Sequence, residues 1–146
     1  MSCTGVKKLT YKFEKLDVWQ LALEYIDEIY YLIEGLPRVE EYNLKGQIIR
    51  AATSIALNIA EGSTGQTDAE QARFLGMATR SLIETVACLH LIRRRHYFKN
   101  ETLLDNAYNN SQILARKLQS FRKTLQSSRN LVRDESAPYL VERDEI

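Results

Sequence analysis

Residues Ala52–Ser63 read ATSIALNIAEGS, a run of small and apolar residues that is interrupted by Asn58 and Glu61 and reaches a glycine at Gly62. On a helical wheel of about 100° per residue, the apolar positions of this region cover much of the circumference instead of a single stripe. Each helix of a four-helix monomer should show one face to water. The stretch therefore predicts a buried helix that also takes part in an oligomer contact.

The polar residues of this helix gather on one narrow strip of the wheel. They are Arg50, Ser54, Asn58 and Glu61. Polar residues in helix seams can fix the register of packed helices, so we interpret these four as packing or oligomer-contact residues. The alternative is that these residues bind a ligand or act in catalysis. It has less support, because no His or Cys lies near Asn58, and because Glu61 is at the end of the helix.

Four segments of the chain carry apolar residues at spacings of three and four, which predicts helices. The segments are Leu16–Glu34, Tyr42–Glu61, a third from Thr67 to about Arg93, and Thr102–Leu131. No run predicts a strand. Four helices with short connections predict an all-α fold, an antiparallel up-down four-helix bundle. We expect one bundle domain over residues 1–133 and an acidic tail over residues 134–146.

Two details of these segments are specific enough to test. Thr67-Asp-Ala-Glu70 matches a capping box, in which the threonine hydroxyl and the glutamate carboxylate bind the first free amides of a helix. The first segment carries a heptad-like seam that we expect to face the core. It consists of Trp19, Ala22, Ile26, Ile29 and Ile33.

Composition and charge limit where the protein acts. The chain has 146 residues, which suits one domain, and a net charge of +1. Residues 134–146 carry five acids and one base, so they sum to −4 and the preceding residues to +5. The two cysteines, Cys3 and Cys88, form no disulfide framework. There is no signal peptide and no apolar run of about 18 residues, so we expect a cytoplasmic protein without a membrane span.

Catalytic and metal-binding motifs are missing from the sequence. A di-iron bundle requires a glutamate three residues before a histidine. Neither histidine of this chain, His90 or His96, has an acid at that position. Cys88 lies in an apolar segment, where a thiol is normally inert. The glycine loop GSTGQ lacks the lysine and the spacing of a phosphate-binding loop. We therefore expect no metal, no cofactor, no small-molecule substrate and no enzymatic activity.

Basic residues of the third and fourth segments are the stronger functional candidates. A run of charged residues often forms only a solvent-exposed helix face. Here, however, no acid lies between Asn106 and Arg133 to compensate for the positive charge of the fourth segment. Lys and Arg that neutralise phosphates bind nucleic acid with little sequence preference and strong salt dependence. The candidate nucleic-acid-binding residues are Arg93, Arg94, Arg95, Lys99, Arg116, Lys117, Arg122, Lys123, Arg129 and Arg133.

Three stretches together resemble one protein family. They are FEKLDVWQLA (residues 13–22), QIIRAATSIALNIAEGS (47–63) and EQARFLGMATRSLIETVACL (70–89). This ordered set resembles the bacterial four-helix bundles of the 23S rRNA intervening-sequence family, which includes the accessory variability determinants (Avd) of diversity-generating retroelements. The resemblance covers roughly residues 11–125. One departure is Ala56, where many relatives have proline.

The resemblance implies a cytosolic homo-oligomer, with a pentameric ring as the expected form. For the retroelement branch it implies a basic scaffold that engages a reverse transcriptase and its template RNA. Our first hypothesis is therefore an oligomeric accessory protein that binds RNA or DNA, with reverse transcriptase as a partner. The alternative is a structural or protein-interaction bundle of the ribosomal intervening-sequence type, with no nucleic-acid role.

Overall fold

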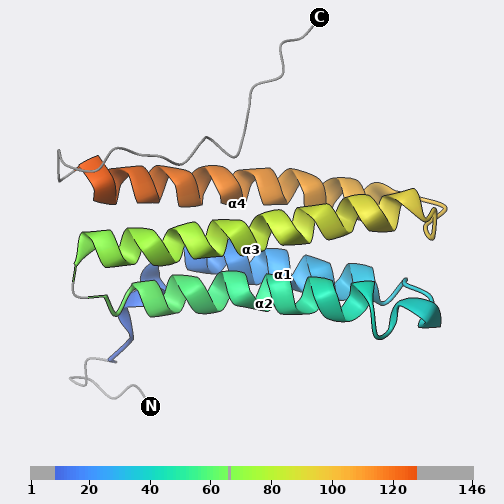
Figure 1. Ribbon diagram of the computed structural model, residues 1–146, viewed down its shortest axis with the longest axis horizontal. Coiled ribbons are helices and arrows are strands. Elements are labelled where there is room, and N and C mark those ends of the chain that lie inside the picture. The colour runs from blue at the N-terminus through green and yellow to red at the C-terminus, as the bar shows by residue number, and fades with distance from the viewer. Residues whose placement is uncertain (1–8, 66, 128–146) are drawn as a thin grey trace, which may run out of the picture.

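The computed structural model describes residues 9–65 and 67–127, which form four α-helices and no β-strand. These are α1 (Asp17–Ile33), α2 (Leu44–Gly62), α3 (Asp68–Arg94) and α4 (Thr102–Ser127), with short 3-10 helices η1 (Lys12–Lys15) and η2 (Arg38–Glu40). The four helices lie side by side along the molecule, and consecutive helices are joined at alternate ends (Figure 1). The predicted all-α, four-helix fold is confirmed for these residues.

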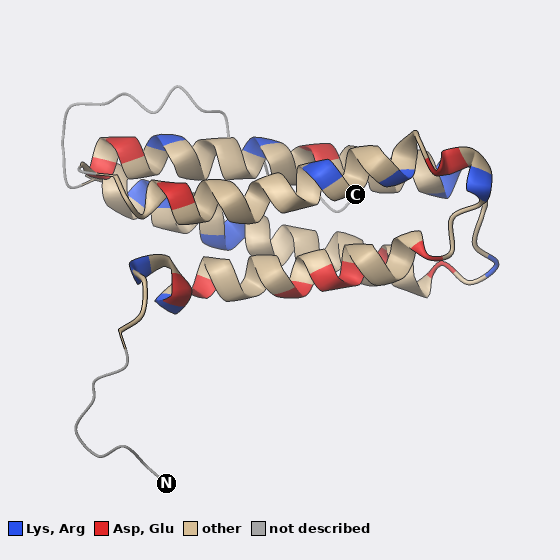
Figure 2. Ribbon diagram, turned by 90° about the horizontal axis from the view of Figure 1, so that it is seen from below, with Lys and Arg blue, Asp and Glu red and all other residues tan. Residues whose placement is uncertain are grey.

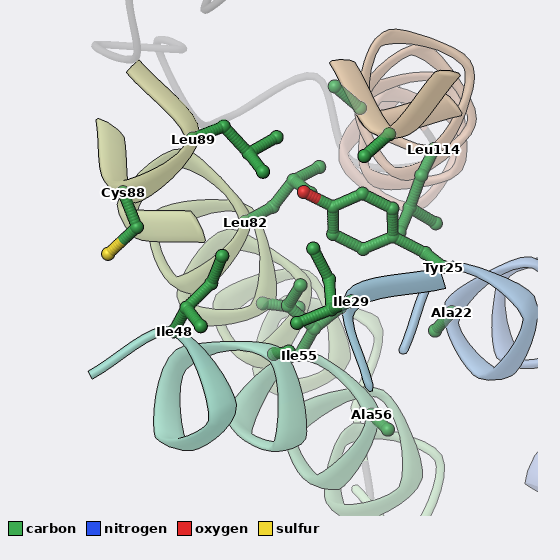
Figure 3. Close-up of a cluster of buried hydrophobic side chains, with 14 of the residues drawn as sticks. Ala22, Tyr25, Ile29, Ile48, Ile55, Ala56, Leu82, Cys88, Leu89 and Leu114 are labelled. Atoms are coloured by element: carbon green, nitrogen blue, oxygen red, sulfur yellow. The ribbon is translucent and has the colours of Figure 1, made fainter. Parts of the chain in front are cut away.

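Each helix packs against the next one in the chain, and α1 also packs against α4. Every helix therefore has two neighbours and turns its apolar residues toward a shared centre. Figure 3 shows Tyr25 reaching from α1 toward Leu82 of α3 and Leu114 of α4. All three side chains are buried. Burial of one large apolar side chain stabilises the fold by about 1.5–3 kcal/mol, so this centre is the main source of stability.

The expected seam of α1 faces the core, but the buried part of the helix is wider than the seam. Ala22, Ile29 and Ile33 are buried, and Trp19 and Ile26 are half-buried and pack against the core. Val18, Tyr25 and Leu32 are buried in addition. The reason is that α1 packs against both α2 and α4, which makes its buried arc wider than one heptad seam and rotates it.

Helix ends follow local sequence signals. Thr67 is the N-cap of α3, and its hydroxyl accepts a hydrogen bond from the Glu70 amide at 3.1 Å, which confirms this half of the capping box. The second helix begins at Leu44 and not at Tyr42, and it ends at Gly62. An added Cβ at Gly62 would lie 2.8 Å from Cβ of Phe74, so glycine lets the start of α3 approach the end of α2 closely. The acidic tail expected at residues 134–146 lies outside the described residues.

Among the described helices, only α3 is long and apolar enough, by length and composition, to cross a membrane. Half of the window that passes this test is buried inside the bundle. A helix in the core of a bundle has the same pattern, because its apolar residues serve its packing against the neighbouring helices.

Candidate nucleic-acid interface

The polar strip of α2 lies along its boundary with α3. Asn58 is buried, and its Nδ2 donates hydrogen bonds to the carbonyl oxygen of Ser54 at 2.9 Å and to the Ser54 hydroxyl at 3.1 Å. From α3, the Ser81 hydroxyl donates to the same Ser54 hydroxyl oxygen at 2.9 Å. Because buried polar groups need such partners, Ser54 and Asn58 serve the packing of two helices within one chain.

The other two residues of the strip are exposed. Arg50 donates to Oε1 of Gln47 at 3.3 Å, and Gln47 donates to Oε1 of Glu84 on α3 at 2.6 Å. Glu61 lies three helical turns farther along α2, about 16 Å from Arg50 at 1.5 Å per residue. The four residues therefore form a line and do not converge on one point, which does not suit a catalytic site.

Arg93 has a structural role at the end of α3. Its guanidinium forms ion pairs with Glu101, just before α4, and with Asp105 in the first turn of α4, the latter at 2.7 Å. The hydrogen bond to Asp105, followed by that to Glu101, raises the pKa of Arg93. Two acids thus already neutralise this base, which makes it a weaker candidate for binding phosphate than its sequence neighbours Arg94 and Arg95.

The bases that follow Arg93 are differently placed. Arg94, Arg95 and Lys99 are exposed, and none of them forms an ion pair with another described residue. They lie in the last turn of α3 and in the connection to α4.

A second set of bases lies in the later half of α4. Arg116, Lys117 and Lys123 are exposed, and we call these three residues the α4 basic face. Arg122 is half-buried: an added Cβ at Gly76 would lie 3.1 Å from Cζ of Arg122, so the guanidinium covers this glycine of α3. Its Nε is buried and forms no hydrogen bond in the described structure. Arg129 and Arg133 lie outside the described residues.

The candidate bases therefore form two groups instead of one. Thr102 begins α4 beside the connection that holds Lys99, whereas Arg116 is fourteen residues farther along the helix. At 1.5 Å per residue, about 20 Å separate Arg116 from the start of α4. One group thus lies at an end of the bundle and the other along its side.

Sequence reasoning missed two bases near the α4 basic face. Arg73 and Arg80 are exposed on the first half of α3, the half that Arg122 contacts through Gly76. Arg73 lies over the ring of Phe74, with Cζ 4.9 Å from its centroid. Their spacing of seven residues, which places both on one side of a helix, is a signal that the sequence already contained.

Charge is distributed unevenly over the bundle. Four acids and no base lie on α1, and Figure 2 shows this helix marked only in red. In contrast, the second half of α4 carries bases and no acid. Within the described residues, only Lys45 and Arg93 among all lysines and arginines form ion pairs.

Other chemically reactive groups are few in the described part of the chain. It contains no group of three or more His, Cys, Asp or Glu that could hold a metal ion. Cys88 is a buried free thiol, and burial raises its pKa, so the nucleophilic thiolate is disfavoured. The ring of His90 packs edge-on against Tyr108 at 5.7 Å between centroids.

Comparison with known proteins gives two findings. A sequence model of the family described as 23S rRNA-intervening sequence protein matches residues 14–120. The fold is similar to the crystal structure of a protein of unknown function from the S23 ribosomal protein family of Bacteroides thetaiotaomicron. That similarity has a TM-score of 0.66 at 30% sequence identity, and it covers 73% of this chain and 98% of the other. No curated protein matches the chain.

Proposed function

Since the chain belongs to the family of 23S rRNA-intervening sequence proteins, we propose that it is a non-enzymatic, oligomeric scaffold that binds nucleic acid. Binding is directed to the phosphate backbone by exposed lysines and arginines of α3 and α4. It has little sequence preference, because phosphate contacts carry no base information.

The observation that supports this proposal most is the shortage of ion pairs around the bases. A basic residue on an ordinary solvated face often has an acid within reach, as Lys45 has Glu41 at 2.9 Å. None of the three bases of the α4 basic face forms an ion pair with a described residue, although α1, which carries four acids, packs against α4. The charges of this face therefore stay available for phosphates, whose binding releases counterions and strengthens as salt is lowered.

Assembly is the second part of the proposal. We propose an antiparallel up-down bundle that forms a homo-oligomer, most specifically a pentameric ring, in the cytoplasm. Leu57, on the exposed side of α2, leaves 57% of its surface open to solvent in the single chain, and Ala60 and Thr53 beside it are small and half-buried. Such a surface suits close contact with another subunit, and repetition of each basic patch around a ring would add avidity.

The most specific form of the proposal places the protein in a diversity-generating retroelement. There the ring would hold template RNA and a reverse transcriptase together, as the resemblance of the three motifs to the broad family that includes the accessory proteins suggests. A reverse-transcriptase gene and a template repeat beside this gene would support that form. A position inside a ribosomal RNA gene would favour the structural alternative.

Nucleic-acid binding can be tested by fluorescence anisotropy with a labelled RNA duplex at 50 and 200 mM salt. We expect binding that weakens steeply with salt. The double variant Lys117→Gln/Lys123→Gln should bind the duplex about tenfold more weakly at 50 mM salt. The slope of the logarithm of the binding constant against the logarithm of the salt concentration (the salt slope) should be shallower by about 1–2, because two phosphates no longer meet a basic side chain.

The matched control is Lys12→Gln/Lys15→Gln, which removes the same charge from exposed lysines of η1, an element that contacts α1 and α2 but not α4. It should bind within about twofold of wild type. If wild type binds neither RNA nor DNA at 50 mM salt, the proposal is wrong and the structural alternative stands.

A further inference from the structure

Two connections of the chain meet at one end of the bundle. The α1–α2 connection (residues 34–43) and the α3–α4 connection (residues 95–101) lie together at the end that is on the right in Figure 1. The Tyr97 hydroxyl donates a hydrogen bond to Oε2 of Glu40 at 3.3 Å. An added Cβ at Gly35 would clash with Cε1 of Phe98, so the aromatic ring rests directly on this glycine. These contacts join the connections into one surface, which we call the loop-end surface.

Most acids of the loop-end surface are occupied by groups of the same chain. Glu40 is buried and accepts hydrogen bonds from Tyr97 and from Nδ2 of Asn43, the latter at 3.2 Å. Glu41 pairs with Lys45, and both Glu101 and Asp105 bind Arg93. Of the acids in and beside the two connections, only Glu34 forms no such contact with a described residue.

Four bases of the same surface have no carboxylate partner in the described structure. They are Arg38, Arg94, Arg95 and Lys99, all exposed. Together with Lys45 and Arg93 they make six bases, against the five acids Glu34, Glu40, Glu41, Glu101 and Asp105, so this end of the bundle carries a small excess of positive charge, +1, which is exposed on these unpaired bases. This excess is independent of the α4 basic face, which lies about 20 Å or more along the bundle.

The α1–α2 connection of the same surface also carries an exposed aromatic ring. Tyr42, two residues after Glu40, leaves 99% of its surface exposed and makes no ring contact with another described residue. The neighbouring Val39 is 75% exposed. A fully exposed ring on a surface that also carries unpaired guanidinium groups has the composition of sites that stack an unpaired base and hold its phosphates.

We propose that the loop-end surface binds single-stranded nucleic acid, with a base stacked on Tyr42 and phosphates held by Arg94, Arg95 and Lys99. This inference rests on the proposed nucleic-acid-binding function and assigns a strand type to one surface. A base in a duplex is already stacked between its neighbours, so only an unpaired base can use the Tyr42 ring. The α4 basic face, which has no exposed aromatic ring of this kind, makes no such distinction.

The test compares two labelled RNA probes by fluorescence anisotropy at 50 mM salt: a 12-nucleotide oligouridine and a 12-base-pair duplex. We expect Tyr42→Ala to bind the oligouridine about tenfold more weakly and the duplex within about twofold of wild type. Tyr42→Trp should keep or improve oligouridine binding, because a larger ring stacks at least as well. Single-stranded DNA of the same length should respond in the same way.

Tyr11→Ala is the matched control, since Tyr11 is 75% exposed and precedes η1 at the opposite end of the bundle. It should leave binding of both probes unchanged. The variant Arg94→Gln/Arg95→Gln/Lys99→Gln should lower the salt slope for oligouridine by about 2, because each phosphate of a single strand that is no longer neutralised reduces the slope by roughly 0.7. Melting curves should show that all variants remain folded, as expected for exposed side chains.

The outcomes separate this inference from the proposed function. If both probes bind and Tyr42→Ala weakens neither, or weakens both equally, the inference is overturned while nucleic-acid binding stands. If Lys117→Gln/Lys123→Gln alone abolishes oligouridine binding, the single strand lies on the α4 basic face and the inference fails. If wild type binds neither probe, both proposals fail, and the loop-end surface is left as a site for a protein partner.

Discussion

Among the described residues, His96 is the only non-glycine residue with a positive φ, 55°. It follows Arg95, the C-cap of α3, and its amide donates to the carbonyl oxygen of Arg93 at 3.1 Å. Helices often end with a residue in this left-handed conformation, which glycine adopts at no steric cost. Histidine does so at a cost, and the turn that results leads the chain from Arg94 and Arg95 into the loop-end surface.

We therefore expect His96→Gly to stabilise the protein by about 0.5–1 kcal/mol, because the relief of left-handed strain exceeds the added freedom of the unfolded chain. Urea unfolding followed by circular dichroism measures this change. As a control, Asn100→Gly at an exposed position of the same connection relieves no such strain and should not stabilise. A loss of stability in His96→Gly would mean that the imidazole makes a compensating interaction.

At the scale of the elements, one buried hydrogen bond connects α1 with α3. The hydroxyls of Tyr25 and Thr85 are 2.8 Å apart, and Thr85 donates its own proton to the carbonyl oxygen of Leu82 at 2.6 Å. Tyr25 must therefore be the donor. Burial raises the pKa of Tyr25, which keeps this donor protonated. The bond spans two helices that are not neighbours in the bundle, so it helps to fix their rotation.

A double-mutant cycle with Tyr25→Phe and Thr85→Val should measure this bond. Thr85→Val leaves a buried hydroxyl of Tyr25 without an acceptor and should cost about 1–3 kcal/mol of unfolding free energy, whereas Tyr25→Phe should cost about 0.5–1.5 kcal/mol. The double variant should lose less than the sum, with a coupling of about 1 kcal/mol. Strict additivity would show that the two hydroxyls do not interact in solution.

At the scale of the whole molecule, the described chain leaves large apolar side chains exposed on several helices. Leu57 of α2 is the most exposed of those on α2, α3 and α4. Because Ser54 and Asn58 are occupied within the chain, we propose that the subunit contact of α2 is centred on Leu57, beside the exposed Arg50 and Glu61. This narrows the expected contact from the whole polar strip to its exposed part.

Leu57→Asp should therefore dissociate the proposed oligomer, because a buried unpaired carboxylate at a subunit contact is costly. Light scattering should give wild type a mass several times 16.9 kDa and the variant a mass close to that value. Ile113→Asp is the matched control: Ile113 is 46% exposed on α4, away from α2, and its substitution should leave the mass unchanged. A monomeric wild type would contradict the assembly.

Features that depend on neighbouring residues in the chain could be predicted from the sequence. The four helices, the cap at Thr67 and the burial of Ile48, Ile55 and Ile59 follow from spacing within a few residues. Helical periodicity and capping are local, so the sequence alone determined the all-α class and the approximate extent of each helix. The family resemblance rests on the same local motifs.

Features that depend on residues far apart in the chain were decided only by the tertiary structure. The Tyr25–Thr85 and Glu40–Tyr97 contacts join residues 60 and 57 positions apart, and the ion pair of Arg93 with Asp105 crosses a turn. Helical periodicity places a side chain on a face but does not say which neighbour meets that face. The sequence therefore determined which bases the protein carries, while packing decided which of them remain unpaired and that they form two separate surfaces.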